Sequence, residues 1–210
     1  QTLKVNRADT RMPRNSQVGA IEVKGPGTIE LYDCTQTGGA GVTAYGLTSV
    51  KVGGYSSVGD IEVGTLETTA STKALPNVTI EGNSAGDISI KTGEVSKGNI
   101  NVSVNKNAIA GEIDMSNCLG KATVNVTEGT AGDITVEGGN VNVKGPYAHV
   151  GAVDLSGITT FALTGANSTV GSLKSTGKQV TINVPAEPTN TLGIGDTGSG
   201  LNTYTKGTIL

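Results

Sequence analysis

The sequence predicts an all-β chain wound as a parallel β-solenoid of about eight rungs, and three observations support this fold class. A short motif, V/A-G-D/E/A-I-x-V, returns along the chain with a period near 20 residues. Within each copy, aliphatic residues alternate with polar ones, the pattern of a strand with one buried face. Gly or Pro interrupts nearly every stretch long enough for a helix, so we expect almost no helix.

The motif glycines mark the repeat. Taken as the origin of each unit, they are Gly19, Gly59, Gly86, Gly111, Gly132, Gly151 and Gly171. Gly39 is the degenerate member between the first two. We expect each glycine at a corner where the backbone turns sharply. Longer spacings in the middle of the chain predict protruding loops near residues 64–76, 91–98 and 116–120.

Each unit contains two strands. The first begins two residues after the glycine, with an inward aliphatic residue. The second strands are expected at residues 28–31, 49–52, 77–82, 99–104, 122–126, 140–145, 161–165 and 179–184. Each unit is therefore strand, corner, strand, corner.

Two arrangements are compatible with such short strands. Antiparallel hairpins in a sandwich have similar spacing, but they give no reason for the same residue type to return at every second strand. In a parallel coil, equal positions become neighbours about 4.8 Å apart, so like residues form columns. We therefore expect Ile61, Ile88, Ile113 and Ile134 in one column.

The chain divides into three parts: a basic extended N-terminal arm over residues 1–18, the solenoid over residues 19–192, and a Gly/Thr-rich C-terminal arm or cap over residues 193–210. The solenoid motif resembles that of parallel β-helix proteins, which include bacterial adhesins, phage tail spikes and fibres, and polysaccharide lyases. The motif is loose, so the resemblance implies an architecture and assigns no functional residue.

Charge is distributed unevenly. Residues 1–18 hold Lys4, Arg7, Arg11 and Arg14 against Asp9, a net charge of 4 − 1 = +3. The remaining chain has 15 − 4 = 11 basic and 18 − 1 = 17 acidic residues, a net charge of −6 and no arginine. Nucleic acid is therefore not an expected partner of the body, because phosphate binding requires clustered Lys and Arg.

An acidic stripe is expected along the solenoid. Its members directly after the glycine are Asp60, Asp87, Glu112 and Asp133, and the outward position two residues later supplies Glu22, Glu62, Asp114 and Asp154. Stacked like charges require solvent, cations or a basic partner. The stripe is interpreted as a hydrated face that prevents aggregation, a docking site for the Arg arm of another subunit, or a cation site. The cation site is the weakest interpretation, because no DxDxDG-type loop is present.

Other chemistry-bearing residues are few. Cys34 and Cys118 lie about four rungs, near 19 Å, apart, too far for a disulfide, so we expect buried free thiols or an intersubunit link. His149 is the only histidine. We expect no catalytic residue, metal ligand or cofactor. Glycosidase chemistry needs two carboxylates, which the stripe contains, but the body lacks aromatic platforms.

Outward Thr and Asn residues also recur, as at Thr79, Asn101, Asn125 and Asn142. A flat, regular Thr array would suggest ice binding. The insertions between rungs are expected to break that spacing, which argues against this function.

The expected function follows from the two ends of the solenoid. The terminal rungs of a solenoid present unpaired backbone groups, and no amphipathic capping helix is evident. We expect a non-enzymatic structural subunit that forms a homo-oligomer or homopolymer, as a filament, sheath or surface layer. The alternative is a phage tail fibre or spike segment, or an adhesin whose loops bind a surface glycan or receptor.

Location is expected outside the cell. No apolar run reaches the roughly 20 residues of a membrane helix. The chain begins with Gln1, which favours a processed, exported form. We therefore expect an extracellular or cell-surface protein, or alternatively a virion component.

Overall fold

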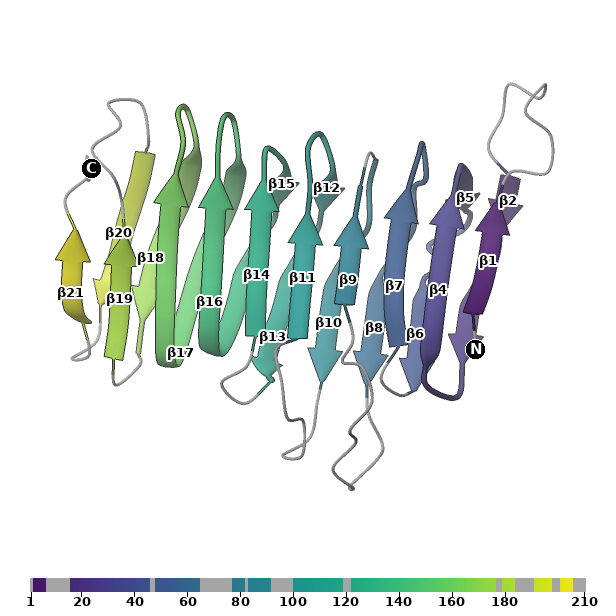
Figure 1. Ribbon diagram of the computed structural model, residues 1–210, viewed down its shortest axis with the longest axis horizontal. Helices are drawn as coiled ribbons and strands as arrows, with labels where there is room; N and C mark the ends of the chain where they lie inside the picture. Colours follow the sequence, from purple (N-terminus) through teal and green to yellow (C-terminus); the bar gives the residue numbers. More distant parts are fainter. Residues whose placement is uncertain are drawn as a thin grey trace.

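The computed structural model shows the chain wound into an elongated parallel β-solenoid (Figure 1). It describes residues 2–6, 16–45, 48–64, 77–81, 83–91, 100–118, 122–176, 179–183, 191–197 and 201–205, with side chains described as far as residue 176. The described part of the chain contains no helix, and so none of the length and apolarity needed to cross a membrane. The fold class predicted from the sequence is confirmed.

Short strands follow one another along the whole chain. They are β1 (Thr2–Asn6), β2 (Ser16–Val18), β3 (Ile21–Val23), β4 (Gly27–Tyr32), β5 (Cys34–Gln36), β6 (Val42–Tyr45), β7 (Thr48–Gly53), β8 (Ile61–Gly64), β9 (Asn77–Ile80), β10 (Ile88–Lys91), β11 (Ile100–Val104), β12 (Ile109–Ala110), β13 (Ile113–Asn117), β14 (Ala122–Thr127), β15 (Thr130–Ala131), β16 (Ile134–Lys144), β17 (His149–Thr164), β18 (Thr169–Ser175), β19 (Gln179–Asn183), β20 (Thr191–Thr197) and β21 (Leu201–Thr205).

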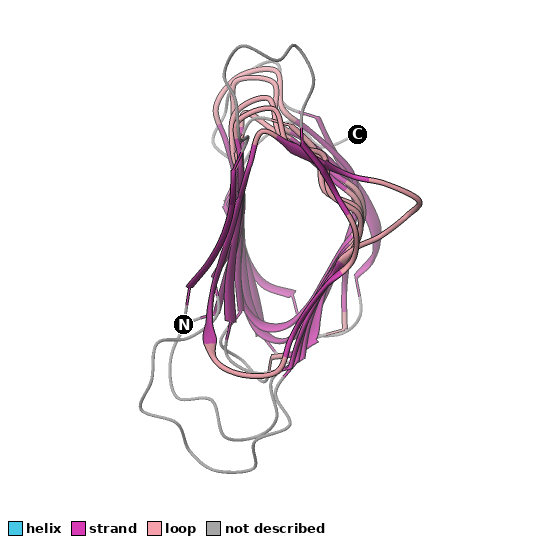
Figure 2. Ribbon diagram, turned by 90° about the vertical axis from the view of Figure 1, so that its right-hand side faces the viewer, coloured by secondary structure: helices cyan, strands magenta, loops and turns pink. Residues whose placement is uncertain are grey.

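The strands build two long walls that enclose the core, as the view along the axis shows (Figure 2). We call the nearer one in Figure 1 the front wall. It stacks β1, β4, β7, β9, β11, β14, the second halves of β16 and β17, β19 and β21. The back wall stacks β3, β6, β8, β10, β13, the first halves of β16 and β17, β18 and β20.

Every described strand pairing is parallel, which excludes the sandwich of antiparallel hairpins. Six inner turns, from β6–β7 to β17, have described side chains and pair with a turn on each side. The expected eight rungs count these six together with the flanking turns β3–β4 and β18–β19.

The core consists of columns of aliphatic side chains. Ile61, Ile88, Ile113 and Ile134 are neighbours in one back-wall column, as the sequence predicts. Each is at most 1% exposed. Because the inward residue of every turn packs on its equivalent in the next, the same aliphatic slot must recur along the chain.

The degenerate unit requires a correction. Val42 is the inward residue that pairs with Ile21 and Ile61. The glycine slot of this unit therefore falls on Ala40 rather than on Gly39, one residue later than the sequence interpretation placed it. The adjacent Gly38 and Gly39 both have positive φ and lie at a turn.

Both terminal ranges contain strands that pair with the stack. Within residues 1–18, β1 pairs with β4 and β2 pairs with β5. Within residues 193–210, strands β20 and β21 pair with β18 and β19. Backbone pairing thus extends the solenoid stack beyond residues 19–192 in both directions.

Candidate functional site

The repeated Gly-Asp pair of the motif forms a contact between successive turns. Asp60 Oδ1 accepts a hydrogen bond from the backbone N–H of Asp87 at 3.0 Å. Asp87 Oδ1 accepts one from Glu112 at 2.8 Å, and Asp133 Oδ1 accepts one from Ala152 at 2.7 Å. The carboxylate of one turn therefore satisfies a backbone donor of the next turn.

The glycine is needed because it leaves room for that carboxylate. A Cβ added at Gly86, Gly111 or Gly151 would overlap the Oδ1 atom of the aspartate one turn earlier. None of these three glycines has positive φ. The sequence interpretation explained the motif glycine by a sharp backbone turn, but the structure explains these three by close approach between turns.

Glu112 differs from the aspartates in this column. A Cβ at the following slot, Gly132, would meet the backbone of Gly111 and Glu112 rather than a carboxylate. Asp60, Asp87, Glu112 and Asp133 nonetheless lie on four successive turns and are all exposed. The structure thus brings together the first half of the expected acidic stripe.

The second half of the stripe is diluted by neutral residues. By strand register, its outward row reads Glu22, Thr43, Glu62, Ser89, Asp114, Thr135, Asp154 and Lys174. Hydroxyl residues separate the acids, so like charges stand two turns, about 10 Å, apart. The repulsion expected from the sequence is therefore weaker on this row than on the Asp60 column.

Lysines neutralise part of the outward row. Glu62 lies 3.5 Å from Lys91 Nζ and Asp154 lies 3.5 Å from Lys174 Nζ. Asp114 Oδ1 accepts a hydrogen bond from the backbone N–H of Ser116 at 2.9 Å. The residues expected to bind the stripe, Arg7, Arg11 and Arg14, lie outside the described residues.

Among the described side chains, the outward charges of the front wall lie in its N-terminal third, apart from Lys144 on β16. Lys4 pairs with Glu30 at 2.8 Å, and Lys51 pairs with Glu81 at 3.0 Å. The hydrogen bond that Lys4 donates to Glu30 raises the pKa of Lys4. The hydrogen bond that Lys51 donates to Glu81, and then the one with Tyr32, raise the pKa of Lys51. These are exposed pairs that solvent and salt screen.

Further along the front wall, the outward residues with described side chains are short and neutral apart from Lys144. Asn101 Nδ2 donates to Asn77 Oδ1 at 2.9 Å, and Asn142 Nδ2 donates to Asn125 Oδ1 at 3.0 Å. The insertions leave the rows intact, contrary to the sequence expectation, because they lie between the walls and the strands stay in register. The rows mix Asn, Thr, Ser and Ala, so they are not the uniform Thr array considered for ice binding.

Cys34 and Cys118 are both buried, and neither forms a disulfide. Cys34 Sγ lies 3.7 Å from Ser56 Oγ, and Cys118 Sγ donates to the carbonyl oxygen of Ile90 at 3.3 Å. Burial raises the pKa of the Cys34 thiol. An intersubunit disulfide is not supported, because it requires an exposed thiol.

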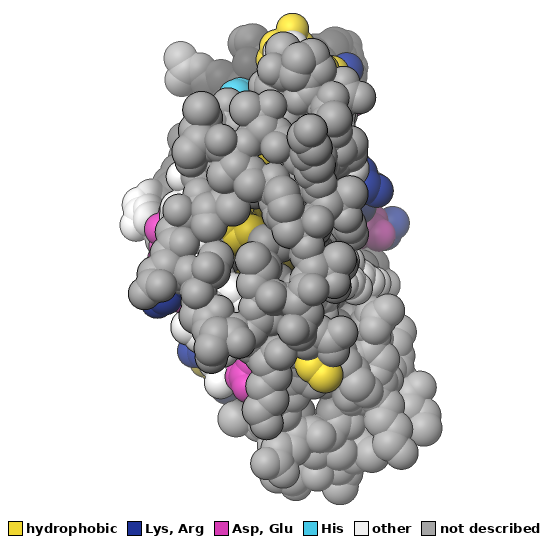
Figure 3. Space-filling model, turned by 90° about the vertical axis from the view of Figure 1, so that its left-hand side faces the viewer, with side chains coloured by type: hydrophobic (Ala, Val, Ile, Leu, Met, Phe, Trp, Pro, Cys, Tyr) yellow, Lys and Arg dark blue, Asp and Glu magenta, His cyan; other side chains and the backbone are white. Residues whose placement is uncertain are grey.

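His149 is exposed on the edge between the walls, where its Nδ1 lies 2.6 Å from Thr169 Oγ1. It is visible near the top of the molecule in the view toward the C-terminal end (Figure 3). Among the described residues, no group of three or more His, Cys, Asp or Glu side chains is placed to hold a metal ion.

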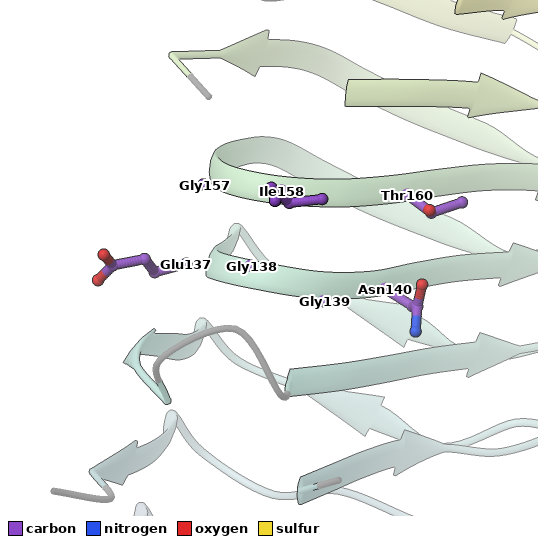
Figure 4. A pocket seen from close by; sticks show the side chains of 7 residues that line it. All are labelled: Glu137, Gly138, Gly139, Asn140, Gly157, Ile158 and Thr160. Carbon is purple, nitrogen blue, oxygen red and sulfur yellow. The ribbon is translucent and has the colours of Figure 1, made fainter. Parts of the chain in front are cut away.

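One open hollow of about 630 Å³ lies beside the corners of β16 and β17 (Figure 4). Glycines 138, 139 and 157 line it together with Glu137, Asn140, Ile158 and Thr160. Glu137 is the single titratable side chain in this lining, whereas paired-carboxylate chemistry needs two.

The comparisons with known proteins add no assignment. No family model, curated protein or solved structure matches the chain.

Proposed function

We propose that the chain is a structural subunit whose copies join head to tail through the ends of the solenoid. The observation that carries this proposal is that the strand at each end of the described stack has a described partner on one side only. Within the described residues, β1 pairs only with β4 and β21 pairs only with β19. Strand edges without a partner favour pairing with another chain. Because the two edges lie at opposite ends of the stack, such head-to-tail contacts build an open chain of copies.

The end surface alone is too small for a firm junction. Two strands about 17–20 Å long, set about 10 Å apart, present a few hundred Å² per partner. Stable interfaces bury about 800 Å² per partner. The proposal therefore includes a second attachment, in which the Arg7, Arg11 and Arg14 segment of one copy binds the acidic stripe of another.

The stripe supports this attachment through its remaining acceptors. Oδ1 of Asp60, Asp87 and Asp133 already accepts a backbone N–H. Each carboxylate retains a second oxygen, and an arginine side chain offers several donors in a planar fork. The proposed docking residues are Arg7, Arg11 and Arg14 on one copy with Asp60, Glu62, Asp87, Glu112, Asp114 and Asp133 on the other.

Sedimentation and electron microscopy at low and high salt test this function. Deleting residues 1–18 is unsuitable, because it removes β1 and β2. The variant is instead R7Q/R11Q/R14Q, and the matched control K24Q/K106Q/K144Q removes the same charge elsewhere. We expect polymers of the native chain at low salt, shorter ones near 1 M salt where screening acts within about 3 Å, and weaker assembly of the arginine variant only. Native-like polymers of the arginine variant would refute the docking role, and a monomer under all conditions would refute the function.

A recognition module is the second candidate, favoured by apolar side chains exposed along the edge that contains β5, β12 and β15. Tyr55 is 76% exposed, Tyr147 is 63% exposed and Ile109 is 54% exposed. Exposed aromatic residues are enriched at binding sites. Loops expected near residues 64–76, 91–98 and 116–120 would add contacts. They fall largely outside the described residues, but they join β8, β10 and β13 to the front wall in three consecutive turns.

This second candidate predicts a closed assembly, such as a trimer, that binds a surface glycan or receptor. Mass measurement in solution distinguishes it from an open polymer. For both the structural subunit and the recognition module, we propose an extracellular or cell-surface location, or alternatively a place in a virion. Localisation of the tagged protein in its host checks it.

A further inference from the structure

The strand register of the front wall predicts which residues lie opposite each other at the junction between copies. One inward column runs through all ten stacked strands of this wall, from Leu3 on β1 through Ile29, Val50, Val78, Val102, Val124, Val141, Phe161 and Ile182 to the backbone position of Tyr204 on β21. The column thus keeps an apolar or aromatic residue from the first strand to the last.

Among the column members with described side chains, the first one is uncovered. Leu3 is 41% exposed, whereas Ile29 in the next turn is 1% exposed. A hollow of about 220 Å³ lies beside it, and its apolar lining comes from Leu3, Val23, Pro26 and Ile29. An apolar side chain from one further strand would remove this surface from water.

We propose that β21 of one copy pairs in parallel with β1 of the next copy, with Thr203 opposite Thr2, Tyr204 opposite Leu3 and Thr205 opposite Lys4. This inference rests on the proposed head-to-tail function and defines its register. The outer edges of β21 and β1, which have no partner among the described residues, run in the same direction, because all strands of the wall are parallel. They can therefore exchange the same ladder of hydrogen bonds that joins β1 to β4.

A slip of one residue is disfavoured by the alternation of the strands. It would set Thr203 or Thr205 over Leu3 and move Tyr204 to the outward row. Such a shift exchanges the inward and outward sets of a strand. In the proposed register, the outward partner of Lys4 is neutral, so no like charges meet.

The back wall makes no equivalent contact at this junction. β1 precedes β3 by half a turn, and β21 follows β20 by half a turn. When β21 meets β1, strands β20 and β3 stand two strand places apart. The junction therefore rests on the front wall, consistent with the need for a second attachment.

Engineered cysteines test the register. Opposed residues on neighbouring parallel strands lie about 4.8 Å apart between Cα atoms, within the range of about 4.4–6.8 Å that a disulfide tolerates. The matched variants are T2C/T203C and, independently, K4C/T205C. The mismatched control T2C/T205C sets the cysteines about 8 Å apart, beyond that range. The single variants T2C and T203C control for Cys34 and Cys118.

Assembled protein is oxidised and its covalent products are separated without reductant. We expect a ladder of multimers from both matched variants, forming at least tenfold faster than from the mismatched variant, and none beyond a dimer from the single variants. Polymers that cross-link equally in all pairs, or in the mismatched pair only, would overturn the register and leave the proposed function intact. A failure of every variant and of the native chain to polymerise would overturn both.

Discussion

The carboxylate of Asp133 accepts a hydrogen bond from the backbone N–H of Ala152, 2.7 Å away, across the place where Gly151 has no side chain. The same relation joins Asp87 to Gly111 and Asp60 to Gly86. The Gly-Asp pair of the motif therefore links two turns, because the aspartate carboxylate of one turn occupies the space left beside the glycine of the next turn.

Replacing Gly151 by Ala should destabilise the fold by about 1–3 kcal/mol, the usual cost of overpacking a close contact. Gly19 is the matched control, because it occupies the same slot of the repeat but has open space around its Cβ position. We expect G19A to change the stability by less than about 0.5 kcal/mol. Urea unfolding followed by circular dichroism measures both, and equal losses would contradict the proposed role of the glycine.

The aspartate and the glycine should be energetically coupled. D133A alone loses the hydrogen bond to Ala152, at a cost of about 1 kcal/mol. The same substitution removes the atom nearest to the added Cβ of G151A. We expect the double variant to be more stable than the sum of the two single effects predicts, by about 1 kcal/mol. Additive losses in the unfolding experiment would show that the two residues act independently.

Removal of the Thr159 hydroxyl should stabilise the protein. Its Oγ1 is buried without a hydrogen-bond partner, and the residue is 3% exposed. Val has the same branched shape without the unsatisfied polar atom, so T159V should raise the unfolding free energy by about 1 kcal/mol. T160V, at the neighbouring outward position, is the control. A lower melting temperature for T159V than for the native chain would contradict this expectation.

Cys34 should make stability dependent on pH in the alkaline range. Burial raises the pKa of its thiol above the ordinary value of 9.0. The unfolded chain then loses the thiol proton at a lower pH than the folded chain. This contribution is fully present below about pH 9 and is lost as the pH rises through the folded pKa. We expect the stability difference between the native chain and C34A, which has no thiol there, to shift against the native chain above pH 9.

The same burial protects the thiols from reagents. At pH 8, a disulfide-exchange reagent should label Cys34 and Cys118 only after unfolding, since both are buried in the native fold. Rapid labelling of the native protein, or a spontaneous disulfide-linked dimer, would show that a thiol is accessible.

The parallel winding of the chain could be predicted from the sequence, because each side-chain column requires the same residue type at the same position of every repeat. Ile61, Ile88, Ile113 and Ile134 share a motif position and share a column. Strand β1 was not predicted because no motif glycine precedes it, and β2 was not predicted because it ends at Val18, where the first motif copy begins. The shift from Gly39 to Ala40 escaped prediction because neighbouring glycines obscured the alternation.

The contact between Asp and Gly of successive turns could not be seen from spacing alone, since it depends on which N–H each carboxylate reaches. One signal was present: the slot that holds Ala40 instead of Gly follows Ala20, which has no carboxylate. The pairing of acids with Thr and Ser on the outward row also depends on register. Glu22 and Glu62 occupy the same position in two motif copies, but Thr43 lies between them on the row.

Helical reconstruction of the assembled protein by electron microscopy tests the central claim most directly. The front wall stacks ten strands per copy, so a head-to-tail junction that continues the wall predicts a rise of about 48 Å per subunit, with strands about 4.8 Å apart along the filament axis. Discrete closed particles, or filaments whose strands do not stack along the axis, would contradict it.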